Sequence, residues 1–367
     1  MDSGVDRVKK LLFLGNPFKY LKGGAEYQYS ILEHHLKEKF AIYYLFRYPT
    51  MATEKNYISY DYKFRKRYNP YLYTDVLTVH RLIRNLCPDI IYRRGVNYIT
   101  AIGVHYAQSR KIKMVLHIAS QRDVEVPKFN ANIKTVFDFL NYYIGKYTIR
   151  NASRIVCQAN YQNTLLQINH KRICDLVFPN MQPIPEEPIN KQAKPIRIVW
   201  VANLKPLKQP ELFIKLAEKF KNTQNTQFIM VGRPSSGTWQ KRLSERINQL
   251  PNLEYRGEQS IEQVNKLLSE SHILVNTSRF EGFSNTYIQA WMRRVPVVTL
   301  NADPDSMIET KGFGYHSRTF QQMVRDVGSL IKHHNLRENM GKNSQRFALK
   351  TFSTSNVEKL INLFGQL

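Results

Sequence analysis

The sequence predicts an α/β protein with two parallel, doubly wound sheets, each in its own Rossmann-like domain. Three observations carry this prediction. Apolar segments of strand length alternate with segments of helical spacing in both halves of the chain. A proline-rich stretch without periodicity, residues 181–195, separates the halves and is expected to be a linker. The length of 367 residues exceeds what one hydrophobic core ordinarily organises.

The first domain is predicted over residues 1–180. It opens with a short apolar strand, a loop containing Gly23 and Gly24, and a segment in which apolar residues recur at helical spacing. Further strands and helices follow by the same criteria. The predicted strands are Lys10–Leu14, Ala41–Phe46, Ile90–Tyr92, Lys113–His117 and Asn151–Cys157, and the predicted helices are Glu26–Lys39, Val76–Leu86 and Asn160–Ile168.

The same alternation restarts after the linker and predicts a second domain over residues 196–350. The predicted strands are Arg197–Val201, Gln227–Gly232, Leu253–Tyr255 and Ile273–Asn276, and the predicted helices are Pro210–Phe220, Trp239–Asn248 and Ile261–Ser269. A last helix is expected within residues 351–367. Ser355 and Glu358 have the spacing of a capping box at its start, and Val357, Leu360 and Phe364 fall on one apolar face.

The composition excludes several classes of protein. No run approaches the roughly 20 apolar residues of a membrane-spanning helix, so the protein is expected in the cytoplasm. Cys87, Cys157 and Cys174 are widely spaced, which predicts neither a disulfide framework nor a zinc site. Asp303 and Asp305 are interpreted as loop structure, and no metal site is predicted.

The charge favours an anionic partner. The chain has 54 Lys and Arg against 29 Asp and Glu, a net charge of +25. The densest segment, Tyr60–Tyr73, alternates aromatic residues with cations. This mixture suits the headgroup layer of an anionic bilayer, and a solvated loop or helix face explains it equally well. Nucleic acid is not expected as a partner, because no RNA-binding signature or zinc-finger spacing accompanies the charge.

The segment from Ser278 to Trp291, followed by the apolar run Val295–Val298, points to the chemistry. It predicts a buried strand, a turn that carries Glu281 and Gly282, and a helix. The first-turn N–H groups of a helix have no partner inside it, and glycine lets a ligand approach the backbone closely. Such a helix N-terminus binds anions, and a diphosphate is the expected ligand.

This segment resembles the signature of retaining nucleotide-sugar glycosyltransferases with the GT-B fold, known as glycosyltransferase family four. Other family motifs are matched in order along the chain, namely Gly23–Gly24, Pro88–Tyr92, Phe178–Asn180 and Asn203–Lys208. The resemblance implies two Rossmann-like domains facing across a cleft. In the family, the first domain binds the acceptor, the second binds the nucleotide sugar, and the last helix crosses back to the first domain.

The resemblance also implies roles for individual residues. Glu281 would contact hydroxyls of the transferred sugar, and Lys208 would neutralise the donor diphosphate. His117, at the end of a first-domain strand, matches a family histidine near the acceptor and the donor sugar. The remaining donor-binding residues would be Gly282, Phe283, Ser284, Asn285, Gln289, Lys205, Asn203 and Arg233, while Gly23 and Gly24 would form an acceptor or phosphate loop.

Two positions depart from the family pattern. Gln289 stands where a glutamate usually holds the ribose hydroxyls, and an amide lacks the charge that strengthens such hydrogen bonds. Asn203 stands where many relatives have an arginine, so Lys205 is the candidate for the missing charge.

The expected protein is a retaining, metal-independent glycosyltransferase that needs no cofactor beyond its nucleoside diphosphate sugar. Its acceptor would be a glycan or lipid-linked glycan of bacterial surface polysaccharide synthesis, and an anionic membrane surface is a candidate partner at the inner face of the cell membrane. Two alternatives remain open. One is a sugar-nucleotide epimerase of the same fold, and the other is a non-catalytic sugar-nucleotide-binding subunit.

Overall fold

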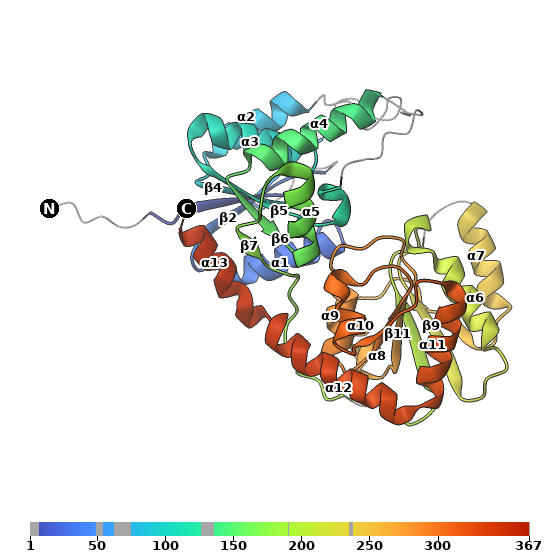
Figure 1. Cartoon of the computed structure of the whole chain (residues 1–367). Coiled ribbons are helices and arrows are strands. Elements are labelled where there is room, and N and C mark those ends of the chain that lie inside the picture. Colours follow the sequence, from blue (N-terminus) through green and yellow to red (C-terminus); the bar gives the residue numbers. More distant parts are fainter. Residues whose placement is uncertain are drawn as a thin grey trace. The chain divides into compact units, whose positions relative to one another are not determined.

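The computed structural model describes residues 7–48, 54–61, 75–125, 136–189, 191–234 and 238–366. The chain divides into two compact units, each with its own sheet (Figure 1). Unit 1 comprises Met1–Asn180 and Ser355–Leu367, and unit 2 comprises Met181–Thr354. Most of the cation-rich segment Tyr60–Tyr73 falls in residues 62–74, which lie outside the described part of the chain.

Unit 1 is built on a sheet of seven described strands, all parallel, in the order β3-β2-β1-β4-β5-β6-β7. The chain direction across the sheet reverses beside β1, which is where ligands gather in doubly wound folds. The strands are β1 (Lys10–Leu14), β2 (Ala41–Arg47), β3 (Tyr57–Tyr60), β4 (Ile90–Arg94), β5 (Lys113–His117), β6 (Arg154–Cys157) and β7 (Leu176–Val177).

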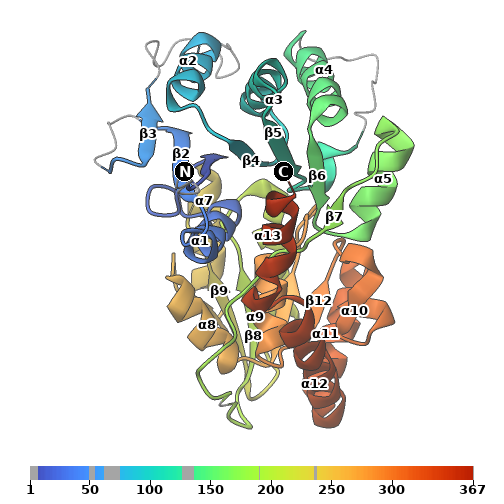
Figure 2. The same ribbon diagram turned by 90° about the vertical axis from the view of Figure 1, so that its left-hand side faces the viewer.

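The helices of unit 1 cover both faces of this sheet. Three of them lie side by side on one face, and the first and last helices lie on the other (Figures 1 and 2). The first group is α2 (Val76–Leu86), α3 (Tyr98–Arg110) and α4 (Val136–Asn151), the second is α1 (Gly24–Leu36) and α13 (Glu358–Gly365), and α5 (Asn160–His170) follows β6. Phe364 of α13 is fully buried, with its ring 5.9 Å from that of Phe40 and 5.8 Å from that of Tyr92. The apolar face of the last helix therefore belongs to the core of unit 1.

Unit 2 repeats the topology with six described parallel strands in the order β10-β9-β8-β11-β12-β13. The strands are β8 (Ile196–Val201), β9 (Thr226–Val231), β10 (Leu253–Tyr255), β11 (Ile273–Asn276), β12 (Val297–Thr299) and β13 (Gly314–His316). The helices are α6 (Pro210–Lys219), α7 (Thr238–Asn248), α8 (Ile261–Ser269), α9 (Asn285–Met292), α10 (Met307–Thr310), α11 (Phe320–Lys332) and α12 (His334–Thr351), with short 3₁₀ turns η2 (Pro206–Lys208) and η3 (Pro304–Ser306).

The two segments at the ends of unit 2 are paired with each other. Gln182 and Ser353 form an isolated parallel bridge, in which the Gln182 N–H donates to the Phe352 carbonyl at 2.8 Å. The Thr354 N–H in turn donates to the Gln182 carbonyl at 3.2 Å. The chain thus enters and leaves this unit along neighbouring segments.

Several predicted boundaries differ from the structure by one to three residues, as in the first helix, which ends at Leu36 and not at Lys39. Two other differences have a clear cause. The last helix does not begin at Ser355, because Thr354–Val357 form the 3₁₀ turn η4 and α13 starts only at Glu358, with no side-chain cap. The extended pairing with Gln182 delays the helix, since the backbone must turn first. The strand predicted from Asn151 begins instead at Arg154, because helical hydrogen bonding reaches Ala152, whose N–H donates to Thr148.

Candidate functional site

The candidate site of unit 2 lies where β8 and β11 end. These strands are neighbours in the sheet, and the chain direction across the sheet reverses between them. Loops that follow adjacent parallel strands emerge at the same edge. The loop after β8 carries Lys208, and the loop after β11 carries Glu281, so residues 73 positions apart in the sequence meet there.

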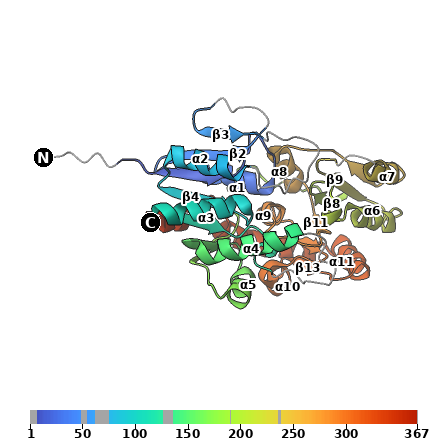
Figure 3. The ribbon, with the colours of Figure 1, turned by 90° about the horizontal axis from the view of Figure 1, so that it is seen from above.

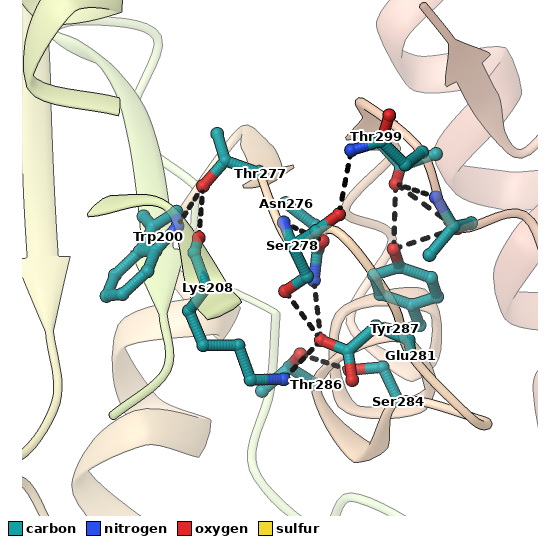
Figure 4. A network of polar contacts seen from close by, with 12 residues as sticks. Trp200, Lys208, Asn276, Thr277, Ser278, Glu281, Ser284, Thr286, Tyr287 and Thr299 are labelled. Atoms are coloured by element: carbon teal, nitrogen blue, oxygen red, sulfur yellow. Dashed lines mark hydrogen bonds and ion pairs between the residues drawn. The ribbon is translucent and has the colours of Figure 1, made fainter. Parts of the chain in front are cut away.

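The Glu281 carboxylate is held through one of its two oxygens (Figure 4). Oε1 accepts hydrogen bonds from Lys208 Nζ at 2.5 Å, Ser278 Oγ at 2.7 Å and Asn276 Nδ2 at 3.3 Å. Within the described residues no side chain or backbone group bonds Oε2. Three bonds fix the orientation of the carboxylate, and its second oxygen can accept a further hydrogen bond.

Lys208 is positioned by the strand ends around it. Thr277 Oγ1 lies 2.7 Å from the Lys208 carbonyl oxygen and accepts a hydrogen bond from the buried indole of Trp200 at 2.9 Å (Figure 4). The Arg279 N–H donates to the Leu207 carbonyl at 3.0 Å. These bonds tie the two loops together. The ammonium has three donors, so it can bind an anion while it remains paired with the carboxylate.

The helix α9 begins beside this ion pair. Ser284 is its N-cap residue, Asn285 is its first residue, and its first turn contains no acidic side chain to occupy the N–H groups. Phe283 fixes the turn, since it is 3% exposed and its ring lies 5.0 Å from that of Phe352. Gly282, between Glu281 and this anchor, completes the turn that leads into the helix. The site therefore combines a cation, a carboxylate and a helix N-terminus.

The other predicted phosphate ligands lie less directly in this arrangement. Lys205 is exposed and precedes the η2 turn, and Asn203 is half-buried in the same loop. Arg233 lies in the loop after β9, and the Arg233 carbonyl accepts a hydrogen bond from the Leu204 N–H at 3.0 Å. Its guanidinium is already engaged by Glu258 through two bonds of 2.9 and 2.7 Å. A phosphate role for Arg233 therefore competes with this ion pair.

Gln289 is 5% exposed and points from α9 toward α8. Its Nε2 donates to Asn265 Oδ1 at 3.1 Å. The contact joins two amides, so either side chain can be the donor once both amides are turned over. The sequence did not single out Asn265, and no local motif marks it, because the contact joins residues 24 positions apart in two helices.

The predicted residues of the first domain belong to unit 1. Gly23 is the N-cap of α1 and Gly24 is its first residue, at the carboxyl end of β1. A Cβ at Gly23 would lie 2.3 Å from a carboxylate oxygen of Glu26, so that side chain would have to move. His117 ends β5, at the same edge of the sheet. The structure thus brings the three residues to one edge of the first sheet.

His117 is fully buried in a polar cluster. Its Nδ1 lies 2.6 Å from the Tyr92 hydroxyl and 3.0 Å from Arg94 Nη1, and its Nε2 lies 3.1 Å from the Phe178 carbonyl oxygen. The carbonyl can only accept, so Nε2 carries the proton and Nδ1 accepts. Burial, and next the Arg94 guanidinium, lower the pKa of His117 well below 6.5. The imidazole is neutral in the folded protein.

One further group of side chains has the composition of a metal site. Ligand atoms of Asp303, Glu309 and His316 lie within 4.8 Å of one another. Two of them have other partners, because the Asp303 carboxylate accepts the N–H groups of Ile308 and Glu309 at 2.8 and 3.2 Å, and Glu309 pairs with Arg318 at 2.6 Å. Both carboxylates thus have protein partners without a metal ion, Asp303 in backbone N–H groups and Glu309 in Arg318.

The second half of the chain matches a family model. Residues 182–347 match the model described as glycosyl transferases group 1. These residues include the Lys208 and Glu281 pair, the start of α9 and Gln289.

Known proteins resemble larger parts of the chain. A poly(ribitol-phosphate) alpha-N-acetylglucosaminyltransferase of Staphylococcus aureus is 25% identical over 231 residues, which are 60% of this chain and 46% of that protein. The chain thus spans less than half the length of this curated relative.

Several solved structures match almost the whole chain. Sucrose-phosphate synthase of Thermosynechococcus elongatus has a TM-score of 0.77 at 13% identity and covers 98% of this chain and 99% of its own. Anabaena HepE, solved in complex with UDP and glucose, has a TM-score of 0.75 at 15% identity and covers 98% of this chain and 100% of its own. These matches confirm the GT-B fold.

Proposed function

We propose that this protein is a retaining glycosyltransferase, on the premise that its residues 182–347 match the model of the glycosyl transferases group 1 family. It moves a hexosyl group from a nucleoside diphosphate sugar to a glycan or lipid-linked glycan. The observation that carries the proposal is the Glu281 carboxylate, whose Oε1 is held by Lys208, Ser278 and Asn276 while Oε2 accepts no bond from the described residues.

Each group at this site has a part in the reaction. Glu281 Oε2 accepts from a hydroxyl of the donor sugar and fixes its orientation. Lys208 and the N–H groups at the start of α9 bind the diphosphate and stabilise the charge that it gains as the glycosidic bond breaks. These groups suffice to stabilise the leaving group, so the proposed reaction is independent of a metal ion. The leaving phosphate takes the proton of the acceptor hydroxyl on the same face, which retains the anomeric configuration.

The supports for the individual substrates differ. Anabaena HepE was solved with UDP and glucose, which favours a UDP-sugar as donor. The staphylococcal relative is named for poly(ribitol-phosphate), a polymer whose phosphates make it anionic, which supports a polymeric acceptor. No described helix is long and apolar enough to cross a bilayer. We place the enzyme in the cytoplasm, attached peripherally to the inner face of the cell membrane through its positive charge.

The first experiment measures the melting temperature with UDP, GDP, ADP, CMP and their sugar conjugates, with and without EDTA. A ligand that binds only the folded protein raises the melting temperature. We expect stabilisation by UDP and UDP-sugars that survives EDTA and is lost in Lys208→Ala. A second assay follows release of UDP with and without a glycan acceptor, so that transfer is separated from binding.

The remaining outcomes separate the alternatives. Stabilisation by a nucleotide without release of UDP in the presence of any acceptor would favour a binding subunit. Isomerisation of the free sugar nucleotide without an acceptor would favour an epimerase. Stabilisation that disappears with EDTA would contradict a metal-independent site and would direct attention to Asp303, Glu309 and His316.

A further inference from the structure

The three helices on one face of the sheet of unit 1 contain more cations than acids. The helices α2, α3 and α4 lie side by side there, with α3 packed between the other two (Figures 2 and 3). Their sequences contain five cations and one acid, Asp138. The cations are Arg81, Arg84, Arg110, Lys146 and Arg150.

The opposite face of the same sheet has a different charge. Helix α1 contains Glu26 and Glu33 and no Lys or Arg, and α13 contains one residue of each sign, Glu358 and Lys359. Among these five helices, the excess of cations therefore belongs to the layer formed by α2, α3 and α4.

Exposed apolar side chains lie in the same layer. Leu77 of α2 is 83% exposed, and on α4 Tyr143 is 50% and Leu140 39% exposed. Single exposed apolar residues are ordinary. Here they lie on the same helix faces as the cations, because Leu77, Arg81 and Arg84 are spaced i, i+4, i+7, and Leu140, Tyr143 and Arg150 are spaced i, i+3, i+10.

We propose that the outer face of α2, α3 and α4, defined by Leu77, Arg81, Arg84, Leu140, Tyr143, Lys146 and Arg150, is the surface by which this protein docks on an anionic lipid bilayer. The cations bind acidic headgroups, and the leucines and the tyrosine enter the interfacial layer. Among the described side chains of the three helices no exposed carboxylate opposes this contact. A soluble polyanion would use the cations alone and gain little from the apolar residues.

This inference rests on the membrane location proposed above, and flotation of the protein with lipid vesicles tests it. The vesicles contain phosphatidylcholine alone or with 30% phosphatidylglycerol, at low salt. The test variant carries R81E, R84E, K146E and R150E. The control variant carries K219E, K221E, K332E and K342E, which changes the charge equally at exposed positions of unit 2.

We expect wild type and the control variant to float with anionic vesicles and not with phosphatidylcholine alone. The test variant should need at least tenfold more anionic lipid for half-binding, since each cation near the surface contributes measurably to the attraction. Circular dichroism and the melting temperature verify that both variants are folded.

A second measurement tests the apolar part. Replacing Leu77 and Leu140 by serine should weaken vesicle binding severalfold, and tryptophan in Tyr143→Trp should show a blue-shifted emission when vesicles are added. Equal loss in the test and control variants would overturn the assignment of this face, while no binding by wild type would overturn the membrane location as well. Binding that ignores both leucines and is displaced by soluble polyphosphate would assign the face to a polyanion and overturn the bilayer proposal.

Discussion

At the scale of single residues, the candidate site depends on a lysine and a carboxylate that meet from adjacent strands. The side chain of Glu281 is 12% exposed and that of Lys208 is 24% exposed, so their pairing is partly shielded from water. The Coulomb attraction within such a pair is stronger than at the surface, and removing one partner leaves the other charge shielded and unpaired. Substitutions here must therefore be judged by activity and stability together.

Lys208→Ala should lower kcat/KM about 10²- to 10³-fold, because one preorganised group that stabilises the leaving diphosphate is removed. The matched control is Lys205→Ala, three residues earlier in the same loop, whose side chain is exposed and should cost less than about tenfold, since it makes weaker contact with the charge that develops. Steady-state kinetics with the donor varied checks this. Equal losses in the two variants would show that Lys208 stabilises the leaving diphosphate no more than Lys205 does.

Gln289→Glu should tighten nucleotide binding by roughly fivefold, because a charged acceptor strengthens a hydrogen bond to ribose by about 1 kcal/mol. Asn265 can rotate its amide and donate to the new carboxylate, so the contact between the helices survives. Titration calorimetry with UDP checks the affinity. Gln289→Ala serves as the comparison and should weaken binding, and identical affinities for the two variants would exclude position 289 from the nucleotide site.

His117 should make the protein sensitive to acid. Its pKa is lowered in the folded state, so below about pH 6.5 the unfolded chain binds a proton that the folded protein does not. Its contribution to stability is complete above that pH and declines as the pH falls toward the folded pKa, by up to about 1.4 kcal/mol per pH unit.

The variant His117→Gln should lose this slope. Urea unfolding at several values between pH 7.5 and pH 5 compares it with wild type. The difference in stability between the two proteins should shrink as the pH falls. A difference that stays constant over this range would show that His117 is not neutral and buried in solution.

At the scale of elements, α13 lies at the end of the chain and stabilises unit 1, whose sheet lies within Met1–Asn180. Phe364→Ala should lower the stability of unit 1 by about 3–5 kcal/mol, because a fully buried ring between Phe40 and Tyr92 is replaced by a cavity. Hydrogen exchange should rise in β1 and β4 and not in β8 and β9. The control Asn362→Ala lies on the exposed side of the same helix and should change stability by less than about 0.5 kcal/mol.

How well the bounds of a helix or strand can be predicted from the sequence depends on the kind of element. The predicted bounds agree residue for residue with the structure at Lys10–Leu14, Val76–Leu86 and Lys113–His117. These are strands buried on both faces or a helix with one apolar face, and both leave strong patterns. The helix α3 was missed because it is packed between α2, α4 and the sheet, so apolar residues occur around most of its circumference. The strand β3 was missed because it is a four-residue edge strand.

Some residues of the candidate site could be predicted from the sequence, and others depend on how the chain folds. Glu281 and Lys208 were singled out from two separate motifs, and the neighbouring positions of β8 and β11 explain why they meet. The bonds from Ser278 and Asn276 to Glu281 depend on the conformation of one turn, which spacing alone does not specify. The partner of Gln289 depends on how two helices pack, and no local pattern encodes that.

At the scale of the whole molecule, the net charge of +25 must affect stability as well as binding. Like charges repel more strongly in the folded protein than in the expanded unfolded chain. Most of the ion pairs that could offset this join exposed groups, such as Arg318 with Glu309 and Arg256 with Glu254, and each contributes about 0–1 kcal/mol. Self-repulsion should therefore dominate the response to salt.

The melting temperature should rise by several degrees when NaCl increases from about 20 to 200 mM, since the Debye length then falls to below 10 Å and the repulsion is screened. The variant with K219E, K221E, K332E and K342E tests whether repulsion between like charges causes this rise. Each change removes two units of charge, so its formal net charge falls from +25 to +17. It should be more stable than wild type at low salt and should gain less from added salt. If both proteins gain equally, the four lysines do not cause the response to salt. If salt lowers the melting temperature, favourable ion pairs outweigh the repulsion between like charges.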